Sequence, residues 1–190
     1  LEITPPSGRE IVYCQGIYGL ALPGNTARVL WLSKPTSDDK IPITANLDAQ
    51  KHWYCEDIYA GIPEIGSKLA EQFVPQMLGL ERLSAISFGK GCYPGQEVVA
   101  RSQYRGTLKR RAFVVEADAE MQPGAEVFHS SDPDQPAGMV ALSGTVGDQQ
   151  TVALAELKLS ALDGGNLHLG SISGPAVRLG IQPYPLPSQQ

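Results

Sequence analysis

The sequence contains few cysteines and few charged residues, and each shortage excludes a class of protein. Only Cys14, Cys55 and Cys92 stand among its 190 residues, and no C-x-x-C spacing occurs. A small, odd number of cysteines excludes a scaffold held by disulfides, and the spacing gives no support for a structural zinc site. Charged residues make up 18%, but 42% of the chain is hydrophobic and the net charge is only −5. This composition excludes a largely disordered chain.

Long apolar runs and an export signal are also missing. No run of 18 apolar residues occurs, so we expect no helix that spans a membrane. Residues 1–9 carry proline and charge in place of the apolar centre of a signal peptide, which favours a reducing, cytoplasmic setting. The acidic net charge argues against a direct nucleic-acid partner. Because the sequence starts with Leu1 in a loop-like segment, we expect a fragment whose site lacks part of its walls.

Turn-forming residues are abundant, and they indicate an α+β fold. The chain has 20 glycines and 15 prolines, which predicts many turns and much β-structure. We divide it into three parts, 1–55, 56–106 and 107–190. The first and third contain short apolar runs between turn signals, and in the third part these predict a small antiparallel barrel or sandwich. Strands are expected at 10–15, 26–33, 111–116, 125–129, 137–146 and 151–159.

The middle part is expected to contain the helices. Apolar residues within 65–73 recur at helical spacing and predict one helix, which Pro75 ends. Residues 84–88 are expected to be extended. Three glycines within 89–95 then predict a loop that leads into a helix over 94–104, because Pro94 suits the first helical position and Glu97 lies in the first turn.

The glycine-rich loop is the strongest candidate for chemistry. Cys92 stands just before the start of a predicted helix, and Lys90, Arg101 and Arg105 are close to it in sequence. Positive charge and exposed N–H groups favour a thiolate, so Cys92 is a candidate nucleophile. The alternative is a buried, inert cysteine beside a structural loop.

Other polar and aromatic residues allow two interpretations each. Arg101 and Arg105 follow Glu97 at intervals of four, which fits either an exposed row of ion pairs or two guanidinium groups that bind a carboxylate. Trp53 fits either a core position or stacking on a flat ligand. The basic run 109–111 fits either a solvated face or a phosphate contact. The three histidines show no metal-ligand spacing, so no metal site is expected.

One run of residues resembles a known signature. The letters K-G-C-Y-P-G-Q-E-V-V-A-R occupy positions 90–101, and Y-R-G follows at 104–106. This run is similar to the motif of the YgfZ family, which are folate-binding relatives of the glycine-cleavage T-protein, an aminomethyltransferase. Further segments agree with the family, namely D-I-Y-A-G-I-P at 57–63, F-V-P-Q at 73–76 and P-Y-P-L at 183–186.

The resemblance implies an aminomethyltransferase-like fold around a folate site. It implies a ferredoxin-like part with a C-terminal antiparallel β-barrel, and a further N-terminal region absent here. It also implies a tetrahydrofolate-binding protein that assists iron–sulfur cluster assembly or repair and thereby tRNA modification, with iron–sulfur enzymes or assembly proteins as partners. By the same resemblance, Lys90 and Cys92 are the residues of that activity, and Trp53 stacks on the pterin. A folate ligand would then lie in a hollow shared by Trp53 and the loop 89–97, in contact with Trp53, Tyr59, Gln96, Arg101 and Arg105.

Position 59 departs from the family pattern. The family has an acidic residue where this chain has Tyr59. A carboxylate accepts a pair of N–H donors from a pterin, whereas a phenol accepts weakly. The alternative function, a tetrahydrofolate-dependent aminomethyl transferase, needs a placed acid or base, and this departure disfavours it. A third alternative is an interaction module built on the barrel without a ligand. A single local cysteine cannot hold an iron–sulfur cluster alone, so a partner would be needed.

Overall fold

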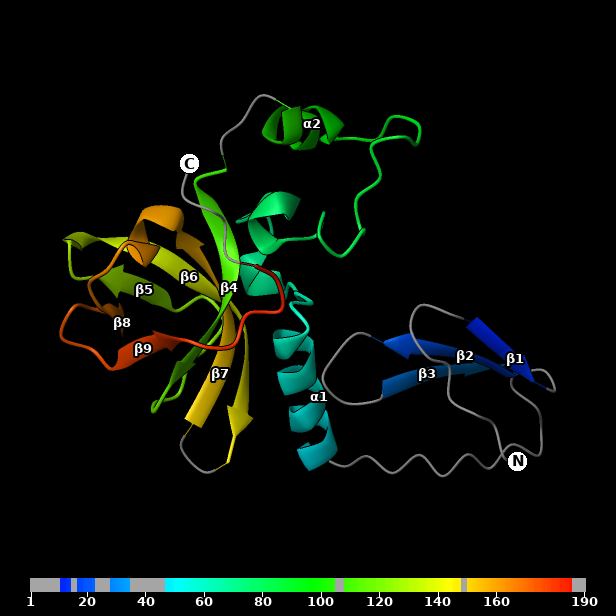
Figure 1. Cartoon of the computed structure of the whole chain (residues 1–190), viewed down its shortest axis with the longest axis horizontal. Coiled ribbons are helices and arrows are strands. Elements are labelled where there is room, and N and C mark those ends of the chain that lie inside the picture. Colours follow the sequence, from blue (N-terminus) through cyan, green and yellow to red (C-terminus); the bar gives the residue numbers. More distant parts are fainter. Residues whose placement is uncertain are drawn as a thin grey trace.

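A closed antiparallel barrel and a separate three-stranded sheet form most of the regular structure (Figure 1). The computed structural model describes residues 11–14, 17–22, 28–34, 47–104, 108–147 and 150–185. Helices and antiparallel sheets occupy separate stretches of the chain, as expected for an α+β protein.

The first sheet consists of three short antiparallel strands in chain order, β1 (Ile11–Cys14), β2 (Ile17–Leu22) and β3 (Arg28–Ser33). The strands β1 and β3 were expected from their β-branched and aromatic residues. β2 was not, although it pairs with β3 from Ile17 opposite Ser33 to Leu22 opposite Arg28. The turn signal L-P-G-N at 22–25, between the two expected strands, lies almost entirely outside the described residues.

Helix α1 (Leu47–Tyr59) connects this sheet to the barrel. It runs across position 55, where the first two parts of the sequence were divided. Ile58 is completely buried and Cys55 is 5% exposed, and both pack on the outer face of the barrel. Figure 1 shows α1 between the barrel and the three-stranded sheet. The apolar stripe is short and interrupted by charge, so periodicity alone did not predict this helix.

The segment after α1 is mostly turns. It contains the 3-10 turns η1 (Ser67–Leu69) and η2 (Pro75–Leu78). The predicted helix over 65–73 is therefore wrong. Only Leu69 of its apolar residues is buried, and Glu71 has a left-handed φ of 66°, which a helix cannot contain. The predicted extended segment 84–88 forms no strand.

The C-terminal part is a closed barrel with strand order β4-β7-β6-β5-β8-β9. The barrel prediction is confirmed, and so are its four long strands. The short strands β8 and β9 were not predicted. The strands are β4 (Arg110–Ala117), β5 (Glu126–His129), β6 (Asp132–Val146), β7 (Gln150–Lys158), β8 (Leu167–Leu169) and β9 (Ala176–Leu179). A 3-10 turn, η3 (Leu159–Leu162), follows β7.

Side chains of the barrel strands alternate between an inner and an outer core. Phe113, Val115 and Ala155 point into the barrel, whereas Val114 and Leu154 point outward under α1. This is the period of two expected for strands, and here both faces are covered. Further along the same outer face, the segment around η2 covers β4 in place of α1. The outer faces of β6 and β7 therefore position α1, and the outer face of β4 positions η2.

No helix within the described ranges is long and apolar enough to cross a membrane.

Candidate functional site

The glycine-rich loop carries an exposed thiol. Cys92 is a free, exposed cysteine, and Lys90 beside it is also exposed, with its Nζ 5.0 Å from the ring centre of Tyr93. Gly95 has a φ of 81°, which a glycine tolerates and which turns the chain into helix α2 (Gln96–Tyr104). The helix predicted over 94–104 is thus confirmed. Cys92 is therefore not buried, as one alternative expected, and its reactivity stays a prediction.

Helix α2 is fixed to the turn η2 by one buried side chain. Val99 is 7% exposed, and its carbonyl oxygen accepts a hydrogen bond of 2.6 Å from Nε2 of Gln76, which is fully buried. Phe88 and Tyr104 pack edge to face with ring centres 5.8 Å apart. The hydrogen bond therefore fixes α2 to η2, and the ring contact joins the start of the Cys92 segment to the end of α2.

The polar residues of α2 divide into occupied and free groups. Oε1 of Gln96 accepts a hydrogen bond of 3.3 Å from the backbone N–H of Tyr93, so its amide closes the first turn. Arg101 is exposed, and within the described residues it forms no ion pair with Glu97. Its guanidinium remains available to a ligand. Arg105 lies outside the described residues.

Trp53 is a partly exposed residue of α1, with 39% of its surface accessible. The guanidinium carbon of Arg28 lies 4.7 Å from the indole ring centre, and this arginine is itself 7% exposed. Nη1 of Arg28 donates to Oδ1 of Asp57 at 2.7 Å and to the carbonyl oxygen of Trp53 at 3.3 Å. Trp53 is therefore not a core residue, and the cation–π contact and the ion pair join β3 to α1.

Tyr59 packs against the outer core of the barrel. Burial raises the pKa of its phenol, and nearby Glu116, Cys55 and Glu56 raise it further. A carboxylate in the same position would face the negative charges of Glu116 and Glu56, which gives a physical reason for a neutral residue at this position. The contribution of Tyr59 to ligand binding stays a prediction.

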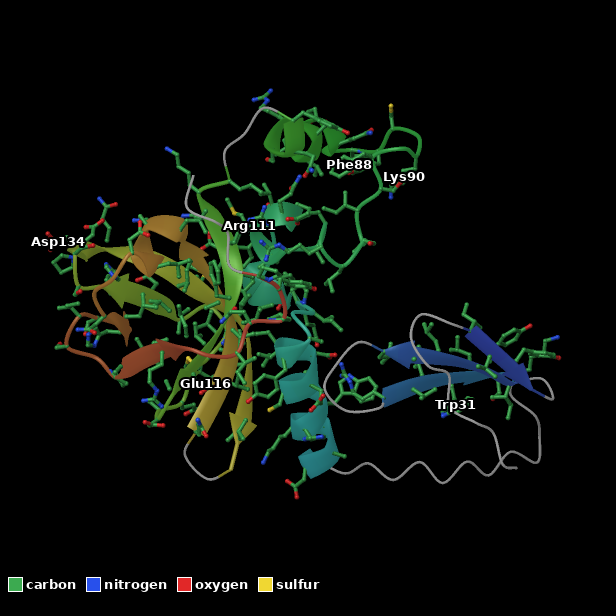
Figure 2. The ribbon with its side chains drawn as sticks, in the orientation of Figure 1. Trp31, Phe88, Lys90, Arg111, Glu116 and Asp134 are labelled. Atoms are coloured by element: carbon green, nitrogen blue, oxygen red, sulfur yellow. The ribbon has the colours of Figure 1, made fainter. Side chains whose placement is uncertain are left out.

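The structure does not bring all the predicted site residues together. Figure 2 shows Lys90 on the loop that precedes α2, well apart from Trp31 in the first sheet, and Figure 1 shows the turns that separate this loop from α1. Neither the cavity beside Gly61 nor the cavity beside Met139 is lined by Trp53 or by any residue of 89–97. Neither of these two cavities is therefore the hollow expected between Trp53 and this loop. That hollow and the individual roles of these residues stay predictions.

Two of the segments that carry the family resemblance meet at one small cavity. Its lining includes Gly61 from D-I-Y-A-G-I-P and Tyr184 from P-Y-P-L, together with Leu78 of η2. Gly61 has a φ of 68°, and a Cβ on it would lie 2.8 Å from the Tyr184 ring and 2.9 Å from Pro183. The hydroxyl of Tyr184 donates to the carbonyl oxygen of Ala60 at 3.4 Å. These motif residues therefore fix the start of the middle segment to the end of the chain.

The basic run at 109–111 is largely occupied by ion pairs. Arg111 pairs with Glu81, and Arg110 Nη1 lies 2.7 Å from Oε2 of Glu156. Burial raises the pKa of Glu156, and its Oε1 is a buried oxygen without a hydrogen-bond partner. Sequence reasoning missed Glu156 and Glu81. The available signal was a single acidic residue inside the apolar run predicted as a strand over 151–159.

The described residues contain no cluster of three or more His, Cys, Asp or Glu side chains able to hold a metal ion. Together, these features define a class: an α+β protein with a six-stranded antiparallel barrel and an exposed cysteine on a glycine-rich loop.

Comparison with known proteins identifies relatives of this class. The chain is 44% identical over 87 residues to the tRNA-modifying protein YgfZ of Serratia proteamaculans, covering 46% of this chain and 26% of the relative. It is 40% identical over 102 residues to the tRNA-modifying protein YgfZ of Sodalis glossinidius, covering 52% and 31%. It is also 42% identical over 94 residues to an uncharacterized protein of Haemophilus influenzae, covering 48% and 33%.

These similarities confirm the resemblance to the YgfZ family, over about half of the chain. The matched part spans about a quarter to a third of the length of each relative. No family model matches the chain.

Proposed function

We propose that this chain is the reactive-cysteine part of a folate-binding protein that supports tRNA modification by assisting iron–sulfur enzymes. Two of the three relatives named above are tRNA-modifying proteins, which supports the tRNA part of the proposal. The observation that carries it is the exposed thiol of Cys92 on a loop fixed through α2 and Gln76. An exposed thiol close to a lysine is accessible to a reaction partner and does not pack the core.

The chemistry assigned to this loop is transient. Cys92 is one ligand, and an iron–sulfur cluster is held by four, so the thiol acts together with a partner that holds the cluster. Lys90, two residues before the thiol, supplies a positive charge that attracts an anion. Arg101, on the exposed face of α2, is the guanidinium available for a carboxylate such as the glutamate tail of a folate.

The fit of a folate ring to Trp53 rests on one open indole surface. Arg28 covers part of the ring, and 39% of the residue remains accessible. A flat heteroaromatic ring stacks favourably on such a surface. A bound tetrahydrofolate would supply a one-carbon carrier, while this chain contributes the stacking surface and the thiol.

The tRNA role is tested in cells of the source organism. After deletion of the gene, tRNA nucleosides are quantified by mass spectrometry, and the gene is restored in full length as wild type, as C92S or as C55S. We expect the deletion to lower nucleosides made by iron–sulfur enzymes, wild type and C55S to restore them, and C92S to fail. Full restoration by C92S at equal protein abundance would contradict the role of the thiol.

Folate binding is tested by fluorescence in the full-length protein. Trp31 and Trp53 are the tryptophans of this chain, so W31F leaves Trp53 as its reporter and W53F leaves Trp31. We expect 5-formyltetrahydrofolate to quench the Trp53 fluorescence of W31F and to leave the Trp31 fluorescence of W53F unchanged. Equal quenching of both variants would contradict stacking at Trp53.

A further inference from the structure

A second cavity lies between the outer face of the barrel and the segment at η2. Its volume is about 260 Å³, near the lower end of the range of about 300–1,000 Å³ for ligand pockets. Its walls come from the segment before and within η2, from the start of β4, and from β6 and β7. The lining residues are Gln72, Phe73, Met77, Arg110, Pro136, Gly138, Met139 and Glu156.

One wall holds a carboxylate with unused hydrogen-bonding capacity. The Glu156 side chain is 3% exposed, and Oε2 pairs with Arg110 while Oε1 has no partner. A buried carboxylate oxygen without a donor is unfavourable, because it has lost water and gained nothing in return. A ligand in the cavity that brings one donor would remove this cost by drawing Oε1, which is closed off from solvent in this structure, toward the cavity.

The strand register places the floor of the cavity. Met139 is paired opposite Glu156, and both point to the outer face, because the next pair, Val140 and Ala155, points into the barrel. At Gly138, β6 approaches β7 so closely that a Cβ would lie 2.0 Å from the carbonyl oxygen of Glu156. Met139 and Glu156 therefore form the floor of the cavity beneath η2.

The remaining lining selects the chemistry of the ligand. Phe73, Met77 and Met139 provide a ring and two thioethers, which favour contact with an aromatic ring. The charge of Glu156 is already balanced by Arg110. Lys158, on the same face of β7, adds a second positive charge, and its Nζ lies 3.7 Å from Oδ2 of Asp132. A cationic ligand therefore gains little here, whereas a neutral N–H donor satisfies Oε1.

We infer that this cavity is a binding site for a small neutral aromatic molecule with one N–H donor, which Oε1 of Glu156 accepts. The site is separate from the proposed function, because none of the residues assigned to the thiol or to the folate lines it.

Indole and benzofuran are matched probes, since they have one shape and differ in an N–H group against an ether oxygen. The three methionines of the chain serve as reporters by ¹³C-methyl NMR. Met77 and Met139 line the cavity, and Met121 is 2% exposed in the barrel core. We expect indole to shift the signals of Met77 and Met139, to leave Met121 unmoved, and to bind about tenfold more tightly than benzofuran.

A variant at the carboxylate completes the test. E156L removes the acceptor at similar size, and we expect it to abolish the preference for indole over benzofuran. An unmoved Met121 signal in E156L reports that the barrel is intact. Equal affinity of the two probes for the wild-type chain, tighter binding of benzylammonium than of indole, or unmoved Met77 and Met139 signals at saturating indole would each overturn the inference without need of the variant.

Discussion

Gln76 donates a hydrogen bond of 2.6 Å from its buried Nε2 to the backbone carbonyl oxygen of Val99. The two residues belong to different motif segments of the resemblance, F-V-P-Q at 73–76 and the cysteine-containing run at 90–101. One side chain therefore fixes helix α2, and with it the loop of Cys92, to the turn that covers the barrel. The position of the Cys92 loop therefore depends on Gln76, a buried residue 16 positions before Cys92.

Replacement of Gln76 by leucine is expected to loosen α2. Q76L removes this buried hydrogen bond to the Val99 carbonyl oxygen, which costs about 0.5–1.5 kcal/mol. Hydrogen exchange followed by mass spectrometry should show faster exchange over 96–104, with the barrel strands unchanged. Q103L, at an exposed position of the same helix, is the control. Equal protection of α2 in Q76L and wild type would show that other contacts fix the helix.

Substitution of two glycines by alanine separates a structural glycine from an open one. Gly61 has a positive φ and touches the Tyr184 ring, so G61A is expected to lower the free energy of unfolding by about 1–3 kcal/mol. A Cβ on Gly89 would have no atom within 4 Å, and its φ is not in the left-handed region, so G89A is expected to be nearly neutral. Urea unfolding measures both. A neutral G61A would mean that the chain end does not pack on this turn.

The sequence predicted those elements whose signals are local. Pro94 and Glu97 mark the start of α2, and turns bound the long barrel strands, so both were expected correctly. Strand β8 has only three residues, too few for a periodic pattern. Helix α1 forms because Cys55 and Ile58 are buried on the barrel, and this contact is invisible in a local window.

In the candidate site, too, the sequence predicted the local features and missed the contacts between residues that are distant in the chain. The motif predicted the exposed Cys92 because glycine and charge gather around it. The pairing of Arg110 with Glu156 spans 46 positions and follows from strand register, which a single sequence does not contain. For the same reason the sequence did not show which residues line the cavities beside Gly61 and Met139.

The two described thiols are expected to differ strongly in reactivity. Cys92 is exposed, whereas Cys55 is buried, and burial followed by the charge of Glu56 raises the pKa of the Cys55 thiol. In a C14S background, iodoacetamide at pH 8 should label Cys92 faster by on the order of a hundredfold or more. Peptide mass spectrometry reads both sites. Equal rates in folded protein, as expected only after denaturation, would contradict the burial of Cys55.

Neutralising the buried carboxylate on β7 is expected to change how stability depends on pH. Burial raises the pKa of Glu156, and this effect outweighs the opposing pairing with Arg110. In the unfolded chain its pKa is about 4.3, so below about pH 4 the carboxyl is protonated in both states. As the pH rises through the higher folded pKa, ionisation favours the unfolded chain, and the wild type loses stability relative to E156Q. Urea unfolding of both proteins between pH 4 and 7 should show a stability difference that grows in favour of E156Q, with E126Q as the control for loss of one exposed charge. A difference that stays constant, or that shifts toward the wild type as the pH rises, would mean that Arg110 compensates fully for the burial of Glu156.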